Sequence, residues 1–214
     1  MERKIVSFES IKNAKADLRK AVKLELSAFV KDKESFERKS SLAAAHFVNS
    51  GFYKSASLVL CFVSLKNEID TTQIITRCLH DGKPVAVPKV LKNGRMAFYR
   101  LQNAPLDSQL EIGAFGILEP KKNLKRLWPI FLPAETVIVL PGLAFSKAGE
   151  RLGKGKGFYD KFLSLAQILS FKFRFSAKKI GLCFDFQIKD KIPCDKHDKT
   201  VDVLVTENGM FLVT

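Results

Sequence analysis

Two stretches of unbroken apolar sequence most constrain the fold of this chain. Residues 57–64 (Ser-Leu-Val-Leu-Cys-Phe-Val-Ser) and 136–140 (Thr-Val-Ile-Val-Leu) have the length of strands, and neither alternates between apolar and polar side chains. A strand with one face in water alternates, whereas a strand covered on both faces, as in a parallel sheet between helices, is apolar throughout. The two segments therefore predict buried strands of a parallel sheet.

The rest of the chain alternates between predicted helices and strands. The expected helices are 10–30, 33–50, 71–82 and 158–170, and the other expected strands are 84–90, 96–101, 179–185 and 201–206, the last two in the chain. The first helix carries an apolar stripe at steps of three and four: Ile11, Ala14, Leu18, Val22, Leu26 and Phe29. Asn93-Gly94 is a hairpin turn signal between two of the strands. We predict an α/β fold, a three-layer sandwich with a mostly parallel central sheet flanked by helices, formed as one domain over residues 1–214.

The excess of basic residues indicates which class of molecule this protein binds. The 214 residues contain 36 Lys and Arg against 22 Asp and Glu, a net charge of +14. Such a chain suits polyanions, either nucleic acid or a phosphorylated or polycarboxylate small molecule. The lysines are scattered along the whole chain, which favours a solvated basic surface over a nucleic-acid-binding arm. In Phe171–Phe175, aromatic and basic residues alternate, as they do in segments that stack on the bases of nucleic acid. The same pattern is typical of an ordinary segment with one buried face.

Cysteine usage and hydropathy indicate the compartment. The four cysteines (Cys61, Cys78, Cys183 and Cys194) form no Cys-x-x-Cys pair and lie in or beside apolar segments, and the three histidines have no metal-ligand spacing. We expect buried thiols in a reducing compartment. No apolar run approaches the ~20 residues of a membrane span, and the N-terminus lacks the apolar core of a secretory signal. The chain is therefore expected to be cytoplasmic with no membrane partner. We also expect a monomer.

A glycine-rich segment follows the buried strand 136–140. Residues 149–160 read Gly-Glu-Arg-Leu-Gly-Lys-Gly-Lys-Gly-Phe-Tyr-Asp, with cations at Arg151, Lys154 and Lys156. Glycines let backbone amides approach an anion closely, and the N-terminus of the next helix adds partial positive charge. Ligands of α/β sheets bind at the carboxyl ends of the strands. The segment therefore predicts a phosphate-binding loop.

Two common nucleotide-binding motifs do not describe this loop. A Walker A motif that starts at Gly149 would need glycine at 154, where lysine stands. A Rossmann fingerprint that starts at Gly153 would need glycine at 158, where phenylalanine stands. A flexible basic loop without a ligand is the simpler alternative, but the regular alternation of Gly and Lys beside a buried strand favours an anion site.

The loop belongs to a longer pattern. Leu140-Pro-Gly-Leu-Ala-Phe145 precedes it, and the sequence also contains Lys15-Ala-Asp-Leu-Arg19 near the N-terminus and Ser64–Thr71 with Glu68 after the first strand. The end of the chain contains Ile192-Pro193, His197-Asp198 and Asp202–Glu207. Taken in their order along the chain, these segments closely resemble the signature of the 5-formyltetrahydrofolate cyclo-ligase family. The resemblance spans nearly the whole chain.

The resemblance implies an ATP- and Mg²⁺-dependent reaction on 5-formyltetrahydrofolate, with polyglutamylated forms among the candidate substrates and no specific nucleic acid. The γ-phosphoryl group of ATP activates the formyl oxygen, N10 attacks the activated carbon, and 5,10-methenyltetrahydrofolate, ADP and phosphate form. By resemblance, Glu68 and Tyr159 would contact the folate, and Asp160 and Asp198 would bind Mg²⁺. The implied ATP-binding residues, with Arg151 and Lys156 also catalytic, are Lys15, Arg19, Arg151, Leu152, Gly153, Lys154, Gly155, Lys156, Gly157 and Phe158.

Each residue also has a simpler interpretation. Lys15 and Arg19 are equally typical of solvated charges on a helix surface. Glu68 is well placed in sequence to cap the helix that begins near residue 71. Asp160 suits the positive end of a helix dipole, and Asp198 suits a polar turn. These alternatives stay open at the level of sequence.

The sequence departs from the family pattern at three positions. Ser146 stands where an aspartate is common, Lys154 where Tyr or Arg is common, and Phe158 where Tyr is common. Any carboxylate role at Ser146 and any hydroxyl contact at Phe158 are therefore in doubt. The Gly-Lys-Gly core, Tyr159 and Asp160 are intact, and Tyr159 suits packing under the loop as well as ligand contact. The alternatives to an active enzyme are a catalytically weakened nucleotide- or folate-binding homologue and a basic nucleic-acid-binding protein.

Overall fold

The computed structural model describes residues 8–92, 94–113, 116–173 and 177–213, and it is built on an eight-stranded sheet. The strand order is β13-β12-β10-β7-β1-β2-β3-β6. The five inner strands, β12, β10, β7, β1 and β2, are parallel, and antiparallel strands form the two edges. Their bounds are β1 Leu58–Cys61, β2 Val85–Val90, β3 Met96–Arg100, β6 Lys125–Leu127, β7 Thr136–Leu140, β10 Lys178–Leu182, β12 Val203–Thr206 and β13 Gly209–Leu212. The mostly parallel sheet is confirmed.

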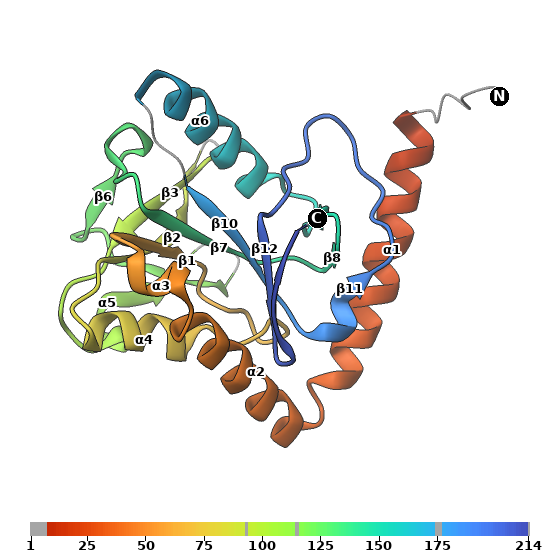
Figure 1. Cartoon of the computed structure of the whole chain (residues 1–214), viewed down its shortest axis with the longest axis horizontal. Helices are drawn as coiled ribbons and strands as arrows, with labels where there is room; N and C mark the ends of the chain where they lie inside the picture. Colours follow the sequence, from red (N-terminus) through yellow and green to blue (C-terminus); the bar gives the residue numbers. More distant parts are fainter. Residues whose placement is uncertain (1–7, 93, 114–115, 174–176, 214) are drawn as a thin grey trace.

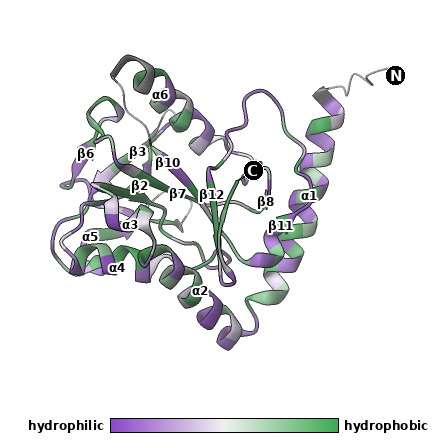
Figure 2. Cartoon of the chain, viewed as in Figure 1, coloured by the Kyte–Doolittle hydropathy of each residue, from purple (hydrophilic) through white to green (hydrophobic). Residues whose placement is uncertain are grey.

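Helices cover both faces of this sheet. They are α1 Phe8–Phe29, α2 Lys33–Val48, α3 Gly51–Ser55, α4 Thr72–His80, α5 Leu106–Gln109 and α6 Phe158–Phe173. Alternate residues of the strands feed two separate cores, because side chains of a strand point to opposite faces: Val59 and Cys61 pack with α1–α4, and Leu58 and Leu60 pack with α6. Figure 1 shows α6 above the sheet, α2–α4 below it and α1 along one side, and Figure 2 shows apolar strands between helices that mix polar and apolar residues. The predicted three-layer α/β sandwich is confirmed.

Most expected elements appear, with shifted ends, but the short ones were not predicted. The expected strand 57–64 is only four residues long, and the second expected helix is followed by a separate α3. The sequence 201–206 is not the last strand, because β13 follows it at the sheet edge with half of its residues exposed. Elements of two or three residues carry too little periodicity to be recognised. Besides β6, they are β4 Leu110–Ile112, β5 Leu118–Pro120, η2 Pro129–Phe131, β8 Ala144–Ser146, β9 Arg151–Leu152, η3 Asp185–Gln187 and β11 Ile188–Lys189.

The apolar stripe expected on α1 holds only in its second half. Val22 and Leu26 are buried, but Ala14 is exposed and the charged Lys15 beside it is buried. The first half of the helix packs over polar groups of the candidate site, so its buried face there is charged. In the predicted hairpin turn, Gly94 has φ +68° while Asn93 lies outside the described residues.

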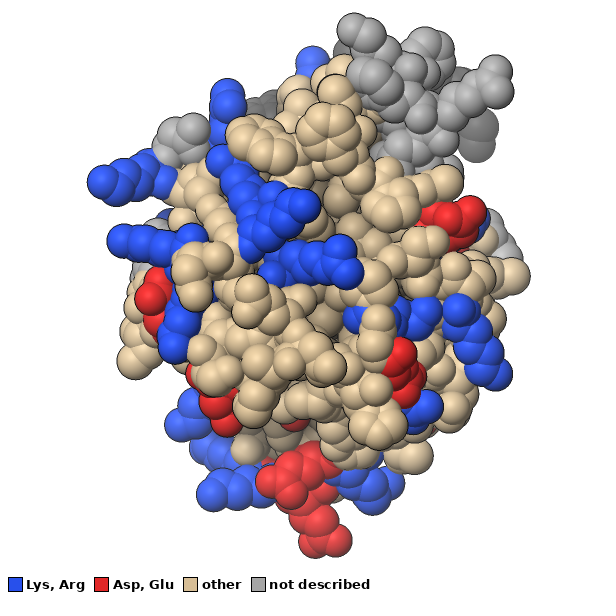
Figure 3. All heavy atoms as spheres, turned by 90° about the vertical axis from the view of Figure 1, so that its left-hand side faces the viewer, with Lys and Arg blue, Asp and Glu red and all other residues tan. Residues whose placement is uncertain are grey.

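The excess of Lys and Arg in the sequence is visible on the surface. Figure 3 shows the side of the molecule at the left of Figure 1, where Lys and Arg side chains gather in the upper part and Asp and Glu lie toward the margins. Residues 174 and 175 of the aromatic-basic segment Phe171–Phe175 lie outside the described residues. Cys61, Cys78 and Cys183 are buried thiols as expected, whereas Cys194 is only half-buried. Among the described helices none is long and apolar enough to cross a membrane.

We expect Gly181 to be required for packing inside the sheet. A Cβ on this residue of β10 would lie 2.7 Å from the Phe145 ring and 3.0 Å from Leu204. Overpacking of this kind costs about 1–3 kcal/mol, so Gly181→Ala should lower the free energy of unfolding by that amount in urea denaturation. Gly51→Ala, where a Cβ meets nothing within 4 Å, is the control and should unfold as wild type does. Equal midpoints for Gly181→Ala and wild type would contradict this packing.

Candidate active site

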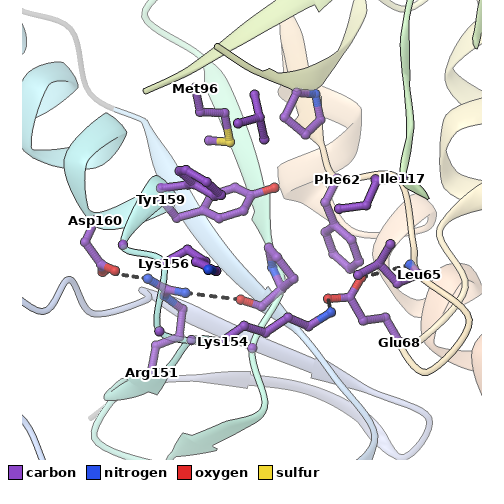
Figure 4. Close-up of a pocket in the computed structure, with 18 of the residues that line it drawn as sticks. Phe62, Leu65, Glu68, Met96, Ile117, Arg151, Lys154, Lys156, Tyr159 and Asp160 are labelled. Atoms are coloured by element: carbon purple, nitrogen blue, oxygen red, sulfur yellow. Dashed lines mark hydrogen bonds and ion pairs between the residues drawn. The ribbon is translucent and has the colours of Figure 1, made fainter. Parts of the chain in front are cut away.

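A pocket of about 490 Å³ lies at the carboxyl ends of β1, β2 and β7. Phe62 follows β1, Val90 ends β2, and Pro141 follows β7, and all three line it. This is the edge at which ligands bind in parallel α/β sheets. One wall of the pocket is polar and contains residues 151–160 with Arg19 and Asp198, and the other wall is largely apolar and contains Phe62, Leu65, Met96 and Ile117 (Figure 4).

The glycine-rich segment begins in a short hairpin and continues as a loop. Within it, Arg151 and Leu152 form β9, which pairs antiparallel with β8, so that both residues are fixed and buried. The chain then turns through Gly155 at φ +95° and Gly157 at φ +67° into α6. These values lie in the region that side chains with a Cβ rarely adopt. The expected strand–loop–helix arrangement is therefore present, with a short hairpin inserted before the loop.

Arg151 ties the loop to both of its neighbours. Its Nη2 donates to Asp160 Oδ1 at 2.6 Å, and its Nη1 donates to the carbonyl oxygen of Pro141 at 3.3 Å (Figure 4). The side chain is only 3% exposed. Its Nε is buried without a hydrogen-bond partner in the structure. Arg151 thus links the end of β7 to the first turn of α6.

Lys154 reaches across the pocket to Glu68. Its Nζ lies 2.6 Å from Glu68 Oε1, and Glu68 Oε2 accepts a hydrogen bond from the backbone of Leu65 at 2.9 Å. Glu68 does not cap α4: Asp70 accepts the hydrogen bond from the backbone of Thr72 at 3.0 Å, where the helix begins. The capping interpretation of Glu68 is therefore wrong, and its carboxylate points into the pocket.

Lys15 is a buried cation between two carboxylates. Its Nζ lies 2.6 Å from Asp195 and 2.5 Å from Asp198. Burial by itself lowers the pKa of Lys15, but the hydrogen bonds and charges of the two aspartates outweigh it, so that the pKa is raised. The hydrogen bond from Lys15 likewise lowers the pKa of Asp195. Lys15 is not a solvated surface charge, and it fastens α1 to the segment that contains Asp198.

Arg19, one turn further along α1, contacts the glycine-rich loop itself. Its Nε donates to the carbonyl oxygen of Gly153 at 3.0 Å, and its guanidinium lies beside Gly155. Arg19 lines the pocket, whereas Lys15 lies behind Asp198. The spacing of four residues places both cations on one face of α1. The structure therefore brings the N-terminal helix to the loop.

Asp160 and Asp198 both line the pocket. Asp160 Oδ1 also accepts a hydrogen bond from the backbone of Lys199 at 3.3 Å, which joins the two segments. Both simpler interpretations hold as well: Asp160 lies in the first turn of α6, and Asp198 Oδ2 accepts the backbone N–H of Asp195 at 2.8 Å. In the described part of the chain, no three His, Cys, Asp or Glu side chains gather as a metal cage. Two carboxylates that face one pocket suit Mg²⁺, which keeps several waters and shares phosphate oxygens.

Tyr159 both packs and lines the pocket. Its ring contacts the cores on both faces of the sheet and lies 6.0 Å from the Arg151 guanidinium. Figure 4 shows the ring projecting into the pocket with its hydroxyl toward the apolar wall. Burial raises the pKa of the Tyr159 hydroxyl well above its usual value, and the charge of Glu68 raises it further. The hydroxyl therefore stays protonated and can donate a hydrogen bond at neutral pH.

The departures from the family pattern have different consequences. Ser146 is fully buried, and its hydroxyl accepts the backbone N–H of Glu150 at 3.2 Å, so that it shapes the β8–β9 turn outside the pocket. Phe158 and Lys154 line the pocket. The apolar wall and Asp195 were missed from sequence. Asp195 could have been noticed three residues before Asp198, whereas Met96 and Ile117 come from distant segments that only the fold brings together.

We expect loss of the Lys15 cation to destabilise the fold in a pH-dependent way. Lys15→Met leaves the carboxylates of Asp195 and Asp198 close together without their cation, which should cost about 1–3 kcal/mol in urea unfolding at pH 7. A carboxylate with a lowered pKa stabilises above its unfolded value of about 3.9 and loses this contribution as the pH falls through its folded value. The difference from wild type should therefore shrink below about pH 3.

The matched control is Lys12→Met, one turn earlier on α1. Its side chain is 66% exposed and its ion pair with Glu9 spans 3.6 Å, so the change should stay within about 0.5 kcal/mol. Equal stability of Lys15→Met and wild type at pH 7, or a difference that is the same at low pH, would refute the buried ion-pair account.

Comparison with known proteins gives one consistent family. The model of the 5-formyltetrahydrofolate cyclo-ligase family matches residues 11–207. A probable 5-formyltetrahydrofolate cyclo-ligase of Caenorhabditis elegans is 30% identical over 96% of this chain and 98% of its own length. The 5-formyltetrahydrofolate cyclo-ligase of Mus musculus is 29% identical over 94% of this chain and 97% of its own.

Solved structures agree with the sequences. The NMR structure of the 5,10-methenyltetrahydrofolate synthetase of Aquifex aeolicus superposes with a TM-score of 0.74 at 31% identity, covering 93% of this chain and 92% of that one. The match of the family model includes most of α1, the pocket residues and Asp198. The fold, the position of the pocket and these matches lead to one conclusion: the chain belongs to the 5-formyltetrahydrofolate cyclo-ligase family.

Proposed function

We propose that this protein converts 5-formyltetrahydrofolate to 5,10-methenyltetrahydrofolate and ATP to ADP and phosphate. The observation that carries the proposal is the construction of the pocket: a glycine-rich cationic wall and a largely apolar wall enclose one cavity of about 490 Å³. A reaction between a nucleotide and a folate needs both substrates in one water-poor space. The family membership supplies the substrate class.

The cationic wall is suited to the phosphates of ATP. Backbone N–H groups of the turn 153–157 and the N-terminus of α6 attract anions, and Lys154 and Lys156 line the same wall. Arg19 holds the turn through the carbonyl oxygen of Gly153. Phosphoryl transfer depends on positioning and charge neutralisation more than on covalent help. We assign the ATP phosphates to Arg19 and residues 151–158, with Lys15 supporting them from behind.

Asp160 and Asp198 are the proposed Mg²⁺ ligands. Both line the pocket beside the loop and supply hard oxygen donors. When bound, Mg²⁺ neutralises phosphate charge during the transfer. Arg151 pairs with Asp160 and Lys15 with Asp198, and these contacts hold the two carboxylates in position.

The apolar wall is suited to the folate. Phe62, Leu65 and Met96 offer surfaces for flat rings, and the Glu68 carboxylate at the edge of this wall accepts hydrogen bonds from ring N–H groups. The protonated Tyr159 hydroxyl lies toward the same wall and is a candidate donor to the substrate. Glu68 and Tyr159 thus position the folate so that its formyl oxygen faces the phosphate-binding loop.

The chain's own groups then act by position and charge. The formyl oxygen takes the γ-phosphoryl group of ATP as the bond from that phosphorus to ADP breaks. N10 then forms its bond to the activated carbon and gives its proton to solvent, and the C–O bond breaks to release phosphate. Lys156 and Arg151 offset the negative charge that develops during transfer. The two walls exclude water, which would otherwise compete as acceptor.

The alternatives have less support. A weakened homologue is disfavoured because Gly153–Asp160 retain the glycines, the cations and Asp160 at the pocket. For nucleic acid, the exposed Trp128 is a natural stacking site, but the Arg126 guanidinium lies 4.1 Å from its ring centroid and occupies one face. We also propose a cytoplasmic monomer formed by one domain over residues 1–214, and attraction of polyglutamylated folates by the basic surface.

We expect Lys156→Ala to abolish most of the activity. Removing a cation from the transferring phosphoryl group costs about 10²-fold or more in kcat. The assay mixes protein, Mg-ATP and 5-formyltetrahydrofolate and follows the absorbance of the methenyl product. Lys147→Ala, on the exposed β8–β9 turn outside the pocket, is the control and should match wild type. No product from folded wild-type protein would refute the proposed function, and full activity of Lys156→Ala would remove that residue from the site.

We expect Asp198→Asn to weaken the response to Mg²⁺. Loss of one anionic ligand should raise the Mg²⁺ concentration for half-maximal activity about tenfold or more. The thermal midpoint of the variant must be measured in parallel, because Asp198 also pairs with Lys15. A Mg²⁺ titration that coincides with that of wild type would show that Asp198 is not a ligand.

A further inference from the structure

The Lys154–Glu68 ion pair joins two residues that the proposed function assigns to different substrates. Lys154 comes from the phosphate-binding loop and Glu68 from the segment between β1 and α4. Their charged atoms lie 2.6 Å apart, with side chains 40% and 11% exposed. Figure 4 shows the pair spanning the pocket between its two walls. A ligand that uses either charge must therefore replace this contact.

The other contacts of the pair make the replacement specific. The backbone of Leu65 holds the second oxygen of Glu68, so the carboxylate stays in place when Lys154 leaves. The loop is held separately, through Gly153 by Arg19 and through Arg151 by Asp160. Lys154 has a long flexible side chain, so it can turn to a phosphate without movement of the backbone. Lys154 can therefore leave Glu68 for a ligand while the backbone of the loop and the Glu68 carboxylate stay in place.

We infer that Lys154 and Glu68 form a latch that makes the binding of nucleotide and of folate cooperative. A nucleotide alone that takes Lys154 leaves a mostly buried Glu68 carboxylate without its cation. A folate alone that takes Glu68 leaves Lys154 without its anion. When both ligands bind, Lys154 and Glu68 each have a new partner. The ion pair is broken only once, so the second ligand binds without that cost. The inference rests on the proposed function and identifies what the unusual lysine at this position does.

Thermodynamic linkage requires the effects of nucleotide and folate on each other's affinity to be equal. If folate tightens nucleotide binding by some factor, nucleotide must tighten folate binding by the same factor. A partly exposed ion pair supports a factor of about three to ten. Lys154 is in this respect a positioning residue, because its effect on folate acts through Glu68.

The test measures the affinity of a non-hydrolysable ATP analogue with Mg²⁺ by calorimetry, alone and with saturating 5-formyltetrahydrofolate. Wild type should bind the analogue about three- to tenfold more tightly with folate present. In Lys154→Met this ratio should fall to about one, and Lys154→Arg should restore part of it. Lys147→Met removes the same charge from the exposed neighbouring turn and should keep the wild-type ratio.

A double-mutant cycle tests the latch without any folate. Glu68→Gln releases Lys154, so it should tighten binding of the analogue alone by about the factor that folate gives in wild type. The same substitution in the Lys154→Met background should change the affinity less than about twofold. An equal gain in both backgrounds would mean simple repulsion between Glu68 and phosphate, and it would overturn the latch.

The outcomes separate the latch from the proposed function. Methenyl product from wild type with an affinity ratio that Lys154→Met leaves unchanged would overturn the latch alone. No product from folded wild type would overturn the proposed function, and the latch with it. A ratio that disappears in Lys154→Met and a gain with Glu68→Gln that requires Lys154 would establish the latch.

Discussion

The buried ion pair between Arg151 and Asp160 is the contact on which the site depends. Arg151 lies in the short strand β9. Its guanidinium donates hydrogen bonds to the carbonyl oxygen of Pro141, just after β7, and to Asp160 in the first turn of α6. Strand end, loop and helix start are thereby held as one unit. The turn between them can present backbone N–H groups in fixed directions, which electrostatic preorganisation of phosphoryl transfer requires.

Around this unit, several cations and carboxylates in and beside the pocket form ion pairs. Lys15 bridges Asp195 and Asp198, Arg151 holds Asp160, and Lys154 meets Glu68. Pairing limits the cost of placing charges in a low-dielectric pocket. It also means that substrates exchange partners with the protein instead of meeting isolated charges. The most exposed of these three contacts, Lys154–Glu68, is the one that a ligand can replace most easily.

The fold was largely predictable because its main signals are local. Continuous apolar runs marked β1 and β7, and the glycine-rich segment marked the loop before α6. The folate side was not predictable in the same way, because Phe62, Met96 and Ile117 come from three separate segments and look like ordinary core residues in sequence. The buried Lys15 was also hidden: helix periodicity treats a lysine as solvated, and only the docking of α1 onto Asp195 and Asp198 explains its burial.

The central claim is that one pocket binds the phosphates of ATP and the formyl group of the folate side by side. A crystal structure of the protein with Mg²⁺, a non-hydrolysable ATP analogue and 5-formyltetrahydrofolate tests it most directly. The account requires the γ-phosphate at the 153–157 turn, the metal between Asp160 and Asp198, and the formyl oxygen next to the γ-phosphate. A folate or nucleotide bound outside this pocket, or a formyl group turned away from the loop, would contradict it.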